Sequence, residues 1–328
     1  MIISEHEILI DAEYCGKRID NAISLILTTY SRSLIKKMIN QQYVWLNGET
    51  TRPDKHVKEG DLIKITIVLD QPTESVQPQE IGLEFIEIND EFLVLNKRAG
   101  LVMHPAPGNK DNTVVNGLIS QFPELKSLPR AGLIHRIDKD TTGLVLVARN
   151  LVSYHDLVKK LSLRTIKREY LAIVNGIMVS GGKIDKPIGR HKMQRKKMTT
   201  REDGKNAITH FKIKNKFRNH CLLDVSLETG RTHQIRVHMA SIGHPIVGDK
   251  VYGWKPCFGK NSSKNLQNTL LNFKRQALHA YKLTFAESGS ENIFQFECEP
   301  PRDFKKLLNE LKIDNLNEDI GYTSHQTR

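Results

Sequence analysis

One aspartate with cationic neighbours stands out for its chemistry in this sequence of 328 residues. Asp138 lies between Arg136 and Lys139 in a charged turn. Cations at that spacing favour the ionised carboxylate, which can then act as a nucleophile or a base at neutral pH. An ordinary surface loop also alternates charges, so this turn alone does not predict a site. The apolar run 144–148 follows directly and predicts a strand that is covered on both faces.

The positive charge of the chain gathers in one segment. The net charge is +12, yet residues 151–282 carry +19 and the remaining segments are slightly negative. A surface that binds a polyanion accounts for such segregation. The densest part is 190–201, which includes Lys196 and Lys197. A charge run by itself is usually a solvated loop, but within this segment contact with RNA is favoured. An anionic membrane is the other candidate, and no amphipathic helix with a broad apolar face supports it.

Several classes of cofactor and metal chemistry find no support in the sequence. There is no Gly-x-x-x-x-Gly-Lys loop and no Gly-x-Gly-x-x-Gly, so neither nucleotide hydrolysis nor a dinucleotide cofactor is predicted. His233, His238 and His244 are spaced five and six apart, which matches neither a metalloprotease helix nor a zinc-finger pair. The sequence therefore predicts no cofactor and no metal.

Cysteine usage and hydropathy predict a cytoplasmic protein. The four cysteines are far apart and indicate free thiols in a reducing compartment. No apolar run approaches the ~20 residues that a membrane span needs. The first residues lack a basic region, so no signal peptide is expected.

The elements before the charged turn form a small domain of their own. Apolar spacing predicts a helix within 16–29 and a second helix that ends near Asn40, with Ser31 or Ser33 as its cap. The polar face of the second helix carries three cations, and short strands follow around an Asn-Gly turn. These three cations are Arg32, Lys36 and Lys37.

The rest of the chain divides into a linker, a larger domain and a tail. The predicted boundaries are 1–68 for the first domain, 69–80 for a Pro- and Gln-containing linker, 81–312 for the second domain and 313–328 for a flexible polar tail. Within the second domain Asn150 is predicted to cap the helix 151–163. Thr232 is predicted to cap a short helix that stops at Gly243.

Four ordered segments resemble the RluA-type pseudouridine synthases. Residues 135–143 read His-Arg-Ile-Asp-Lys-Asp-Thr-Thr-Gly, close to the family's His-Arg-Leu-Asp-x-x-Thr-Ser-Gly, with Ile137 for Leu and Thr142 for Ser. Residues 95–105, 167–172 and 229–238 are similar to the other family motifs. Arg98 departs from the proline that usually follows the motif lysine, and we expect it to alter only a local turn. The likeness is greatest to members that modify large-subunit ribosomal RNA and carry an amino-terminal domain like that of ribosomal protein S4.

The resemblance implies roles for five residues. Asp138 is the catalytic carboxylate, and Arg236 forms an ion pair that keeps it in place and charged. Tyr170 stacks on the target base, although strand tyrosines are more often simply packed. Arg136 fills the space that the flipped uridine leaves, since guanidinium planes stack on bases. His104 lines the RNA side.

The resemblance also implies the fold class and the partners. The chain is expected to be an α+β protein, with a small S4-like domain followed by a mixed, mainly antiparallel sheet flanked by helices. The expected partner of this monomer is ribosomal RNA, which the S4-like domain and the 190–201 segment would bind. Asp138 could attack the ribose, attack the ring or abstract a proton, and the residues allow all three.

Three other functions fit parts of the same pattern. A base-excising glycosidase would also place an aspartate at the anomeric carbon, and it would release free uracil. An RNA-binding assembly factor without catalysis would not need Asp138, Tyr170 and Arg236 together. A transfer-RNA target is the third alternative, which the S4-like domain and 190–201 make less favoured.

Overall fold

The computed structural model describes residues 2–27, 30, 32–69, 76–106 and 108–323. It divides into two compact units, Met1–Ser75 and Val76–Arg328. The predicted catalytic residues Asp138, Tyr170 and Arg236 all lie in the second unit.

The first unit is a four-stranded antiparallel sheet with two helices. The sheet order is β1-β4-β2-β3, and α1 and α2 pack on it through a core made mostly of isoleucines. The predicted Asn-Gly turn joins β2 to β3, with φ of 52° at Asn47 and 86° at Gly48, the values that a tight hairpin turn requires. A cap at Ser31 lies outside the described residues. The elements are β1 (Ile2–Leu9), η1 (Ala12–Tyr14), α1 (Ile19–Ile26), α2 (Arg32–Asn40), β2 (Val44–Leu46), β3 (Glu49–Thr50) and β4 (Leu62–Leu69).

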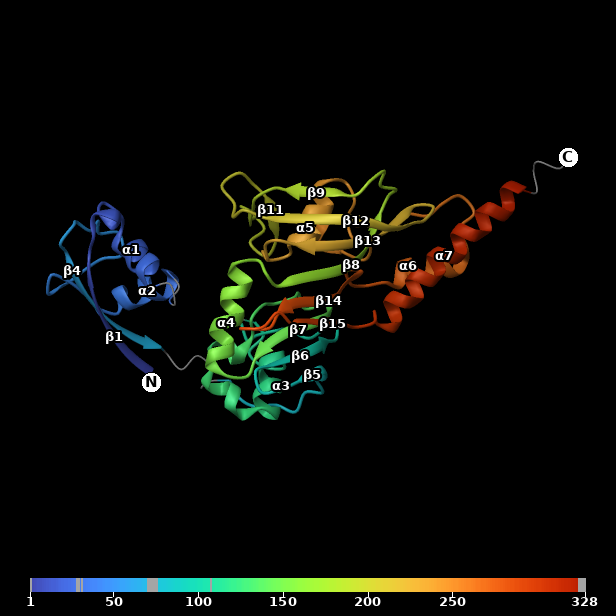
Figure 1. Ribbon diagram of the computed structural model, residues 1–328. Helices are drawn as coiled ribbons and strands as arrows, with labels where there is room; N and C mark the ends of the chain where they lie inside the picture. Colours follow the sequence, from blue (N-terminus) through green and yellow to red (C-terminus); the bar gives the residue numbers. More distant parts are fainter. Residues whose placement is uncertain (1, 28–29, 31, 70–75, 107, 324–328) are drawn as a thin grey trace. The chain divides into compact units, whose positions relative to one another are not determined.

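The second unit is built on a nine-stranded mixed sheet. Its order is β5-β6-β7-β14-β8-β13-β12-β9, with β15 beside β14, and Figure 1 follows this order from β5 at one end to β9 at the other. Among the strands of this sheet that the structure describes, β7 and β14 are the one parallel pair. These strands are β5 (Glu84–Ile88), β6 (Phe92–Lys97), β7 (Thr142–Ala148), β8 (Lys167–Asn175), β9 (Gly182–Asp185), β12 (Ile208–Lys216), β13 (His220–Leu227), β14 (Leu278–Ala286) and β15 (Ile293–Glu297).

Helices and one separate hairpin flank this sheet. Asn150 caps α4 as its sequence predicts, because its side chain accepts a hydrogen bond from Ser153 N at 2.9 Å. The hairpin of β10 (Ile188–Arg190) and β11 (Met198–Thr200) presents the predicted basic segment at its turn. The helices are α3 (Val114–Gln121), η2 (Pro123–Ser127), η3 (Pro129–Gly132), α4 (Leu151–Ser162), α5 (Gln234–Ser241), η4 (Lys250–Tyr252), α6 (Lys264–Asn272) and α7 (Arg302–Thr323).

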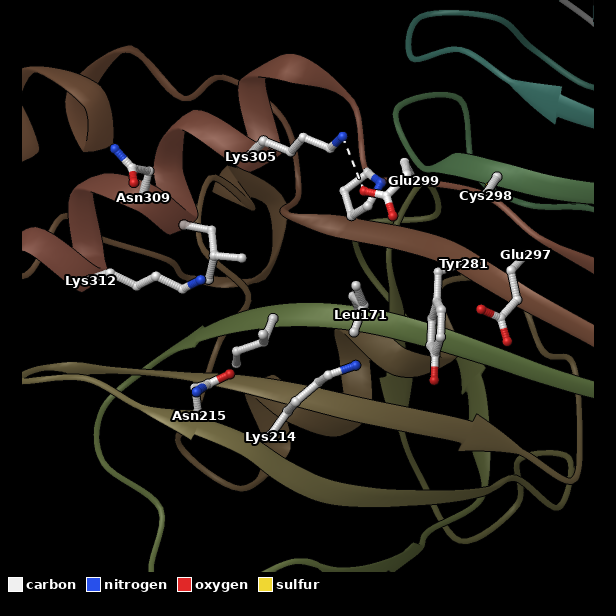
Figure 2. Close-up of a pocket in the computed structure, with 13 residues that line it drawn as sticks. Leu171, Lys214, Asn215, Tyr281, Glu297, Cys298, Glu299, Lys305, Asn309 and Lys312 are labelled. Atoms are coloured by element: carbon white, nitrogen blue, oxygen red, sulfur yellow. Dashed lines mark ion pairs between the residues drawn. The ribbon is translucent and has the colours of Figure 1, made fainter.

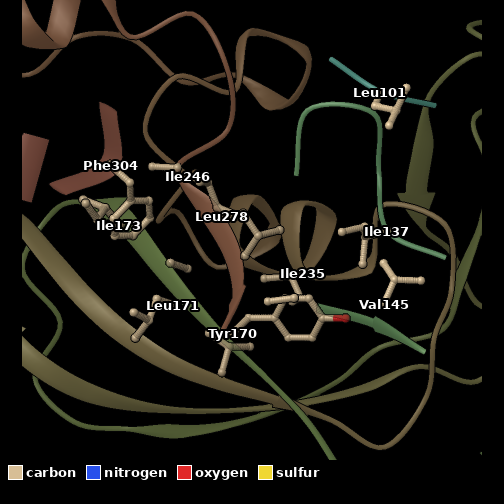
Figure 3. Close-up of a cluster of buried hydrophobic side chains, with 14 of the residues drawn as sticks. Leu101, Ile137, Val145, Tyr170, Leu171, Ile173, Ile235, Ile246, Leu278 and Phe304 are labelled. Atoms are coloured by element: carbon tan, nitrogen blue, oxygen red, sulfur yellow. The ribbon is translucent and has the colours of Figure 1, made fainter. Parts of the chain in front are cut away.

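The core of the second unit lies against both faces of the sheet. β7 is buried along its whole length, which confirms the strand predicted from the apolar run. Figure 3 shows Ile137, Val145 and Ile235 around the ring of Tyr170, so segments far apart in the sequence share one apolar cluster. The cluster holds the turn before β7, the strand β8 and the helix α5 together.

Two predicted boundaries differ in the structure. Residues that we expected to be a polar tail continue α7 to Thr323. Leu311 and Asp314 are buried. The Asp314 carboxylate accepts a hydrogen bond from Ser263 N, at the start of α6, at 3.3 Å. The polar sequence pattern after residue 312 does not reveal this contact. At the other end, Val76 is buried in the second unit, where Asn116 Nδ2 donates to Gln77 O at 2.8 Å, so the end of the expected linker packs on α3.

The start of α5 also differs from its prediction. The N-cap is His233, in the left-handed region with φ of 57°, and not Thr232. The Gln234 side chain accepts from Arg231 N at 2.9 Å and donates to Ile208 O at 2.9 Å. This side chain therefore ties the helix start to β12 in place of a Thr cap. The predicted stop at Gly243 is confirmed, with φ of 83°.

One close backbone approach near the site is at Gly143 on β7. Its φ is 111°, and a side chain there would overlap the carbonyl of Ala280 on the parallel strand β14. Because only glycine accepts both the dihedral angle and the contact, the pairing of β7 with β14 depends on this residue.

We expect Gly143→Ala to lower the free energy of unfolding of the second unit by about 3 kcal/mol, from backbone strain and steric overlap together. Gly289→Ala is the matched control, because Gly289 has φ of 73° with open space around it, and should lower it by about 1–2 kcal/mol. Urea unfolding followed by circular dichroism measures both variants. Equal shifts for the two would show that the contact with Ala280 does not matter.

Candidate active site

A buried lysine fixes the turn that carries Asp138. Lys97, at the end of β6, is 1 % exposed. Its Nζ donates to the carbonyl oxygens of Arg98 at 2.9 Å, Leu101 at 2.9 Å and Lys139 at 2.8 Å. Burial lowers the pKa of Lys97 to about 7, against the opposing charges of Asp140 and Asp138. Three carbonyl acceptors use all three donors of an ammonium group, so this side chain joins two loops at one point.

The carboxylate of Asp138 faces Arg236. Arg236 Nη1 donates to Asp138 Oδ2 at 2.9 Å. The Asp138 side chain is 17 % exposed and that of Arg236 is 7 % exposed, so the pair is partly shielded from water. The ion pair that the resemblance implies is therefore present in the structure.

A second carboxylate holds Arg236 from the other side. Arg236 Nε donates to Asp249 Oδ2 at 2.7 Å and Nη2 donates to Asp249 Oδ1 at 3.0 Å. Burial disfavours the charge of Arg236, but Asp249 and Asp138 outweigh this effect and raise the pKa of the guanidinium. A two-point contact fixes the plane of a guanidinium. Asp249 therefore aims the remaining nitrogen of Arg236 at Asp138.

His233 and Tyr252 complete the surroundings of the carboxylate. His233 Nε2 lies 3.9 Å from Asp138 Oδ1. His233 Nδ1 lies 2.6 Å from Tyr252 Oη, and the guanidinium of Arg236 lies 5.0 Å from the centre of the Tyr252 ring. Burial lowers the pKa of His233, with the charges of Asp138 and Asp249 opposing it. The imidazole is therefore neutral near pH 7.

Tyr170 lies on β8 close to this group. Its side chain is 5 % exposed. Burial raises the pKa of its phenol, the charge of Arg168 lowers it, and Asp138 raises it again. The phenol is thus neutral at physiological pH and within electrostatic reach of Asp138. The structure brings together Asp138, Arg236 and Tyr170, while their catalytic roles remain predictions.

The other predicted residues of the second unit lie around this centre or at its hairpin. Arg136 is exposed, and its charge acts on His233. His104 is half-buried, with Nδ1 2.9 Å from Pro105 O. Lys196 is exposed and Lys197 half-buried in the turn between β10 and β11. None of these four has a hydrogen bond to Asp138 among the described residues.

In the first unit the three predicted cations lie on α2. Arg32 Nη2 donates to Asp20 Oδ1 at 2.9 Å, so part of its charge is used within the unit. Lys36 and Lys37 are exposed. A role in RNA binding for these three stays a prediction.

The three histidines that could suggest a metal serve separate contacts. His238 Nδ1 lies 2.8 Å from Thr209 Oγ1 and His244 Nδ1 lies 2.8 Å from Asn175 O, whereas His233 faces Tyr252. Among the residues that the structure describes, no group of three His, Cys, Asp or Glu side chains could hold a metal ion.

Sequence reasoning missed four contributors to this site. Lys97 and His233 lie inside the motif segments 95–105 and 229–238, but the sequence assigned them no role in the site. Asp249 and Tyr252 were not predicted to be site residues. Asp249 follows Gly248, whose φ is 81° and whose α-carbon lies against the carbonyl of Arg275. Such a glycine before an acidic residue was the available signal, although nothing in the sequence pairs it with Arg236.

Solved structures share this fold. Two human proteins share it, RNA pseudouridylate synthase domain containing 4 and domain containing 1. The first has a TM-score of 0.55 and 24% identity, over 70% of this chain and 93% of its own. The second has a TM-score of 0.52 and 24% identity, over 68% of this chain and 85% of its own. At this identity the likeness concerns the fold alone.

Sequence relatives define the family. Residues 91–241 match the RNA pseudouridylate synthase family and residues 17–63 match the S4 domain. The ribosomal large subunit pseudouridine synthase D of Pasteurella multocida is 43% identical over 91% of this chain and 92% of its own length. The protein of the same name from Haemophilus influenzae is 42% identical over 94% of this chain and 95% of its own length. The chain belongs to the RNA pseudouridylate synthase family.

Several sequence predictions are thereby confirmed. The chain is a pseudouridine synthase, an enzyme that isomerises uridine in RNA, and it joins an S4 domain to a mixed, mainly antiparallel α+β catalytic domain. Of the helices in the described part of the chain, none combines the length and the apolar character that crossing a bilayer demands.

We expect Arg236→Met to lower the free energy of unfolding by about 3–5 kcal/mol, because it leaves the buried Asp249 carboxylate without its partner. The double variant Arg236→Met/Asp249→Asn should recover part of this loss, since the unpaired charge is gone. Urea unfolding of the three proteins measures it. A single variant that unfolds at the parent's midpoint would contradict the pairing.

Proposed function

We propose that this enzyme isomerises specific uridines of large-subunit ribosomal RNA, with Asp138 as the catalytic carboxylate. The observation that carries the proposal is the contact of Asp138 with Arg236, which holds a carboxylate in place where it is partly shielded from water. The names of the relatives, ribosomal large subunit pseudouridine synthase D, support the substrate class.

The reaction needs a carboxylate and no external oxidant or reductant. The bond between N1 of uracil and C1′ of ribose breaks, and a bond between C5 and C1′ forms. C5 loses its proton and N1 gains one, so atoms and electrons balance as an isomerisation. Asp138 takes part at the ribose or at the base, and no cofactor is proposed because the sequence holds no motif for one.

Three further residues act on the target nucleotide in this proposal. The uridine first leaves the RNA stack, at an expense of a few kcal/mol. Arg136, exposed beside His233, fills the space that the base leaves. Tyr170 stacks on the flipped base from the apolar side of the site, and His104 lines the RNA side.

Each of the two units contributes cations to RNA binding in this proposal. Lys196 and Lys197 contact phosphates from the turn between β10 and β11. The domain 1–68 adds Arg32, Lys36 and Lys37, in keeping with its match to the S4 domain. The proposal keeps the sequence-based boundaries, with catalysis in 81–312, a linker in 69–80 and a polar tail after 312. Two of them are revised by the structure, because Val76 packs in the second unit and α7 extends beyond residue 312.

The proposal extends to the setting of the reaction. We place the enzyme in the cytoplasm as a monomer, where precursor ribosomal particles supply the RNA. The four cysteines, described as free thiols, fit a reducing compartment.

We expect the parent chain to release tritium from ribosomal RNA labelled at C5 of uracil, and Asp138→Asn to release none while binding the RNA as tightly. The substitution keeps the shape and removes the charge that the chemistry needs. Asp140→Asn is the matched control, because Asp140 lies two residues away and uses its backbone carbonyl for Arg275; it should keep most of the activity.

Each other outcome of this experiment argues against a distinct part of the proposal. Free uracil in the supernatant would indicate a glycosidase. Release from transfer RNA alone would contradict the ribosomal target. Full release by Asp138→Asn would remove Asp138 from its role.

We expect RNA affinity to fall steeply with salt, and Lys196→Gln/Lys197→Gln to flatten the slope of log K against log salt by about 1 for each lost phosphate contact. Lys306→Gln/Lys312→Gln on α7 is the control with the same change of charge, and its slope should match the parent. Filter binding at several salt concentrations gives the slopes. An affinity that ignores ionic strength would rule out the polyanion surface.

A further inference from the structure

Tyr252 joins the basic hairpin to the catalytic carboxylate. Its hydroxyl oxygen accepts a hydrogen bond from the backbone N–H of Met198 on β11 at 3.0 Å. The same hydroxyl lies 2.6 Å from His233 Nδ1, and the other nitrogen of His233 lies 3.9 Å from Asp138 Oδ1. A continuous line of polar groups thus runs from the strand after the basic turn to Asp138.

The position of Tyr252 depends on the residue that also holds Arg236. Asp249 Oδ1 accepts a hydrogen bond from Val251 N at 3.1 Å and so starts the short helix η4 that presents Tyr252. The Tyr252 ring then lies under the guanidinium of Arg236 at 5.0 Å. One carboxylate therefore fixes both groups that reach Asp138, the guanidinium directly and the phenol through His233.

The hydrogen-bond partners of Tyr252 favour one tautomer of the His233 imidazole. The Tyr252 oxygen already accepts the Met198 N–H, and its own proton remains to be donated. Donation to His233 Nδ1 makes that nitrogen the acceptor, which leaves the ring proton on Nε2, the nitrogen that faces Asp138. A neutral imidazole with this tautomer presents an N–H dipole to Oδ1 while Arg236 binds Oδ2.

We infer that Tyr252 and His233 are positioning residues, which orient the Asp138 carboxylate and tie its geometry to the basic hairpin that receives the RNA backbone. The inference rests on the proposed function and deepens it. The N–H of Met198 holds Tyr252, Tyr252 holds the His233 tautomer, and the N–H of His233 completes the surroundings of Asp138.

The test uses Tyr252→Phe, which keeps the ring under Arg236 and removes only the hydroxyl. In the full-length chain, the single-turnover rate of tritium release at saturating ribosomal RNA should fall on the order of 10-fold, since misplacement of a reacting group by about 1 Å can lower a rate about 100-fold. KM for the RNA should stay unchanged, because Tyr252 acts after binding.

Two further measurements separate positioning from a merely structural effect. The ¹⁵N spectrum of the histidine-labelled protein should show His233 with its proton on Nε2 in the parent and a mixture of tautomers in Tyr252→Phe; His233→Gln assigns the signal. The double variant Tyr252→Phe/His233→Gln should be no slower than His233→Gln alone, because both changes break one line of groups.

Tyr281→Phe is the matched control. Its hydroxyl donates to Asp224 Oδ2 at 2.8 Å, and Figure 2 shows Tyr281 in a groove lined also by Lys214 and Glu297, which holds none of the residues around Asp138. It should leave both rate and tautomer unchanged.

The outcomes distinguish the inference from the function on which it rests. An active parent with Tyr252→Phe equally fast, or with the His233 tautomer unchanged, overturns the inference and leaves the proposed function standing. Additive losses in the double variant also overturn it. A parent that releases no tritium from any RNA argues against the proposed function instead.

Discussion

The arrangement of this site depends on a guanidinium held between two carboxylates. Arg236 binds Asp249 at two points and has one nitrogen left for Asp138. Two carboxylates share one guanidinium, so these three side chains are formally net negative, and Asp138 is the more exposed of the two carboxylates. An arginine bound to Asp138 alone would be free to rotate, and Asp138 with it. The two-point contact with the buried Asp249 fixes the guanidinium, so Asp138 is oriented and stays partly open to a substrate.

The strands around the site explain how distant segments meet at this point. Asp138 precedes β7, Arg236 lies on α5 after β13, and Asp249 stands before η4. The parallel pairing of β7 with β14 places the turn before β7 beside the segment that leads into β14, and it exists because Gly143 admits the Ala280 carbonyl. Lys97 then fixes the turn by donating hydrogen bonds to three backbone carbonyl oxygens. Contacts to the backbone therefore position the site, and the functional side chains are not needed to hold the turn in place.

The sequence predicted features that depend on neighbouring residues along the chain, and it missed contacts between residues that are far apart in the chain. Periodicity and caps predicted β7, the Asn150 cap and the stop at Gly243, because each depends on neighbours along the chain. The motifs supplied Asp138 and Arg236. Asp249 and Tyr252 could not be predicted, since their importance comes from partners 13 to 114 residues away, such as Arg236 and Asp138. The extent of α7 failed for the same reason, because a buried contact of Asp314 overrides a polar pattern.

The net negative cluster raises a problem that the charge distribution answers. A carboxylate with an excess negative charge repels a phosphate backbone, yet the enzyme must draw RNA to it. The cations lie outside the cluster, with Arg136 and Lys139 exposed at its rim and the basic turn beyond β11. In the proposed function these exposed cations attract phosphates at the rim, and screening limits their reach into solvent to about 10 Å. The phosphates then stay at the rim in that proposal, and the uncharged uracil ring with its ribose is the part of the RNA that approaches Asp138.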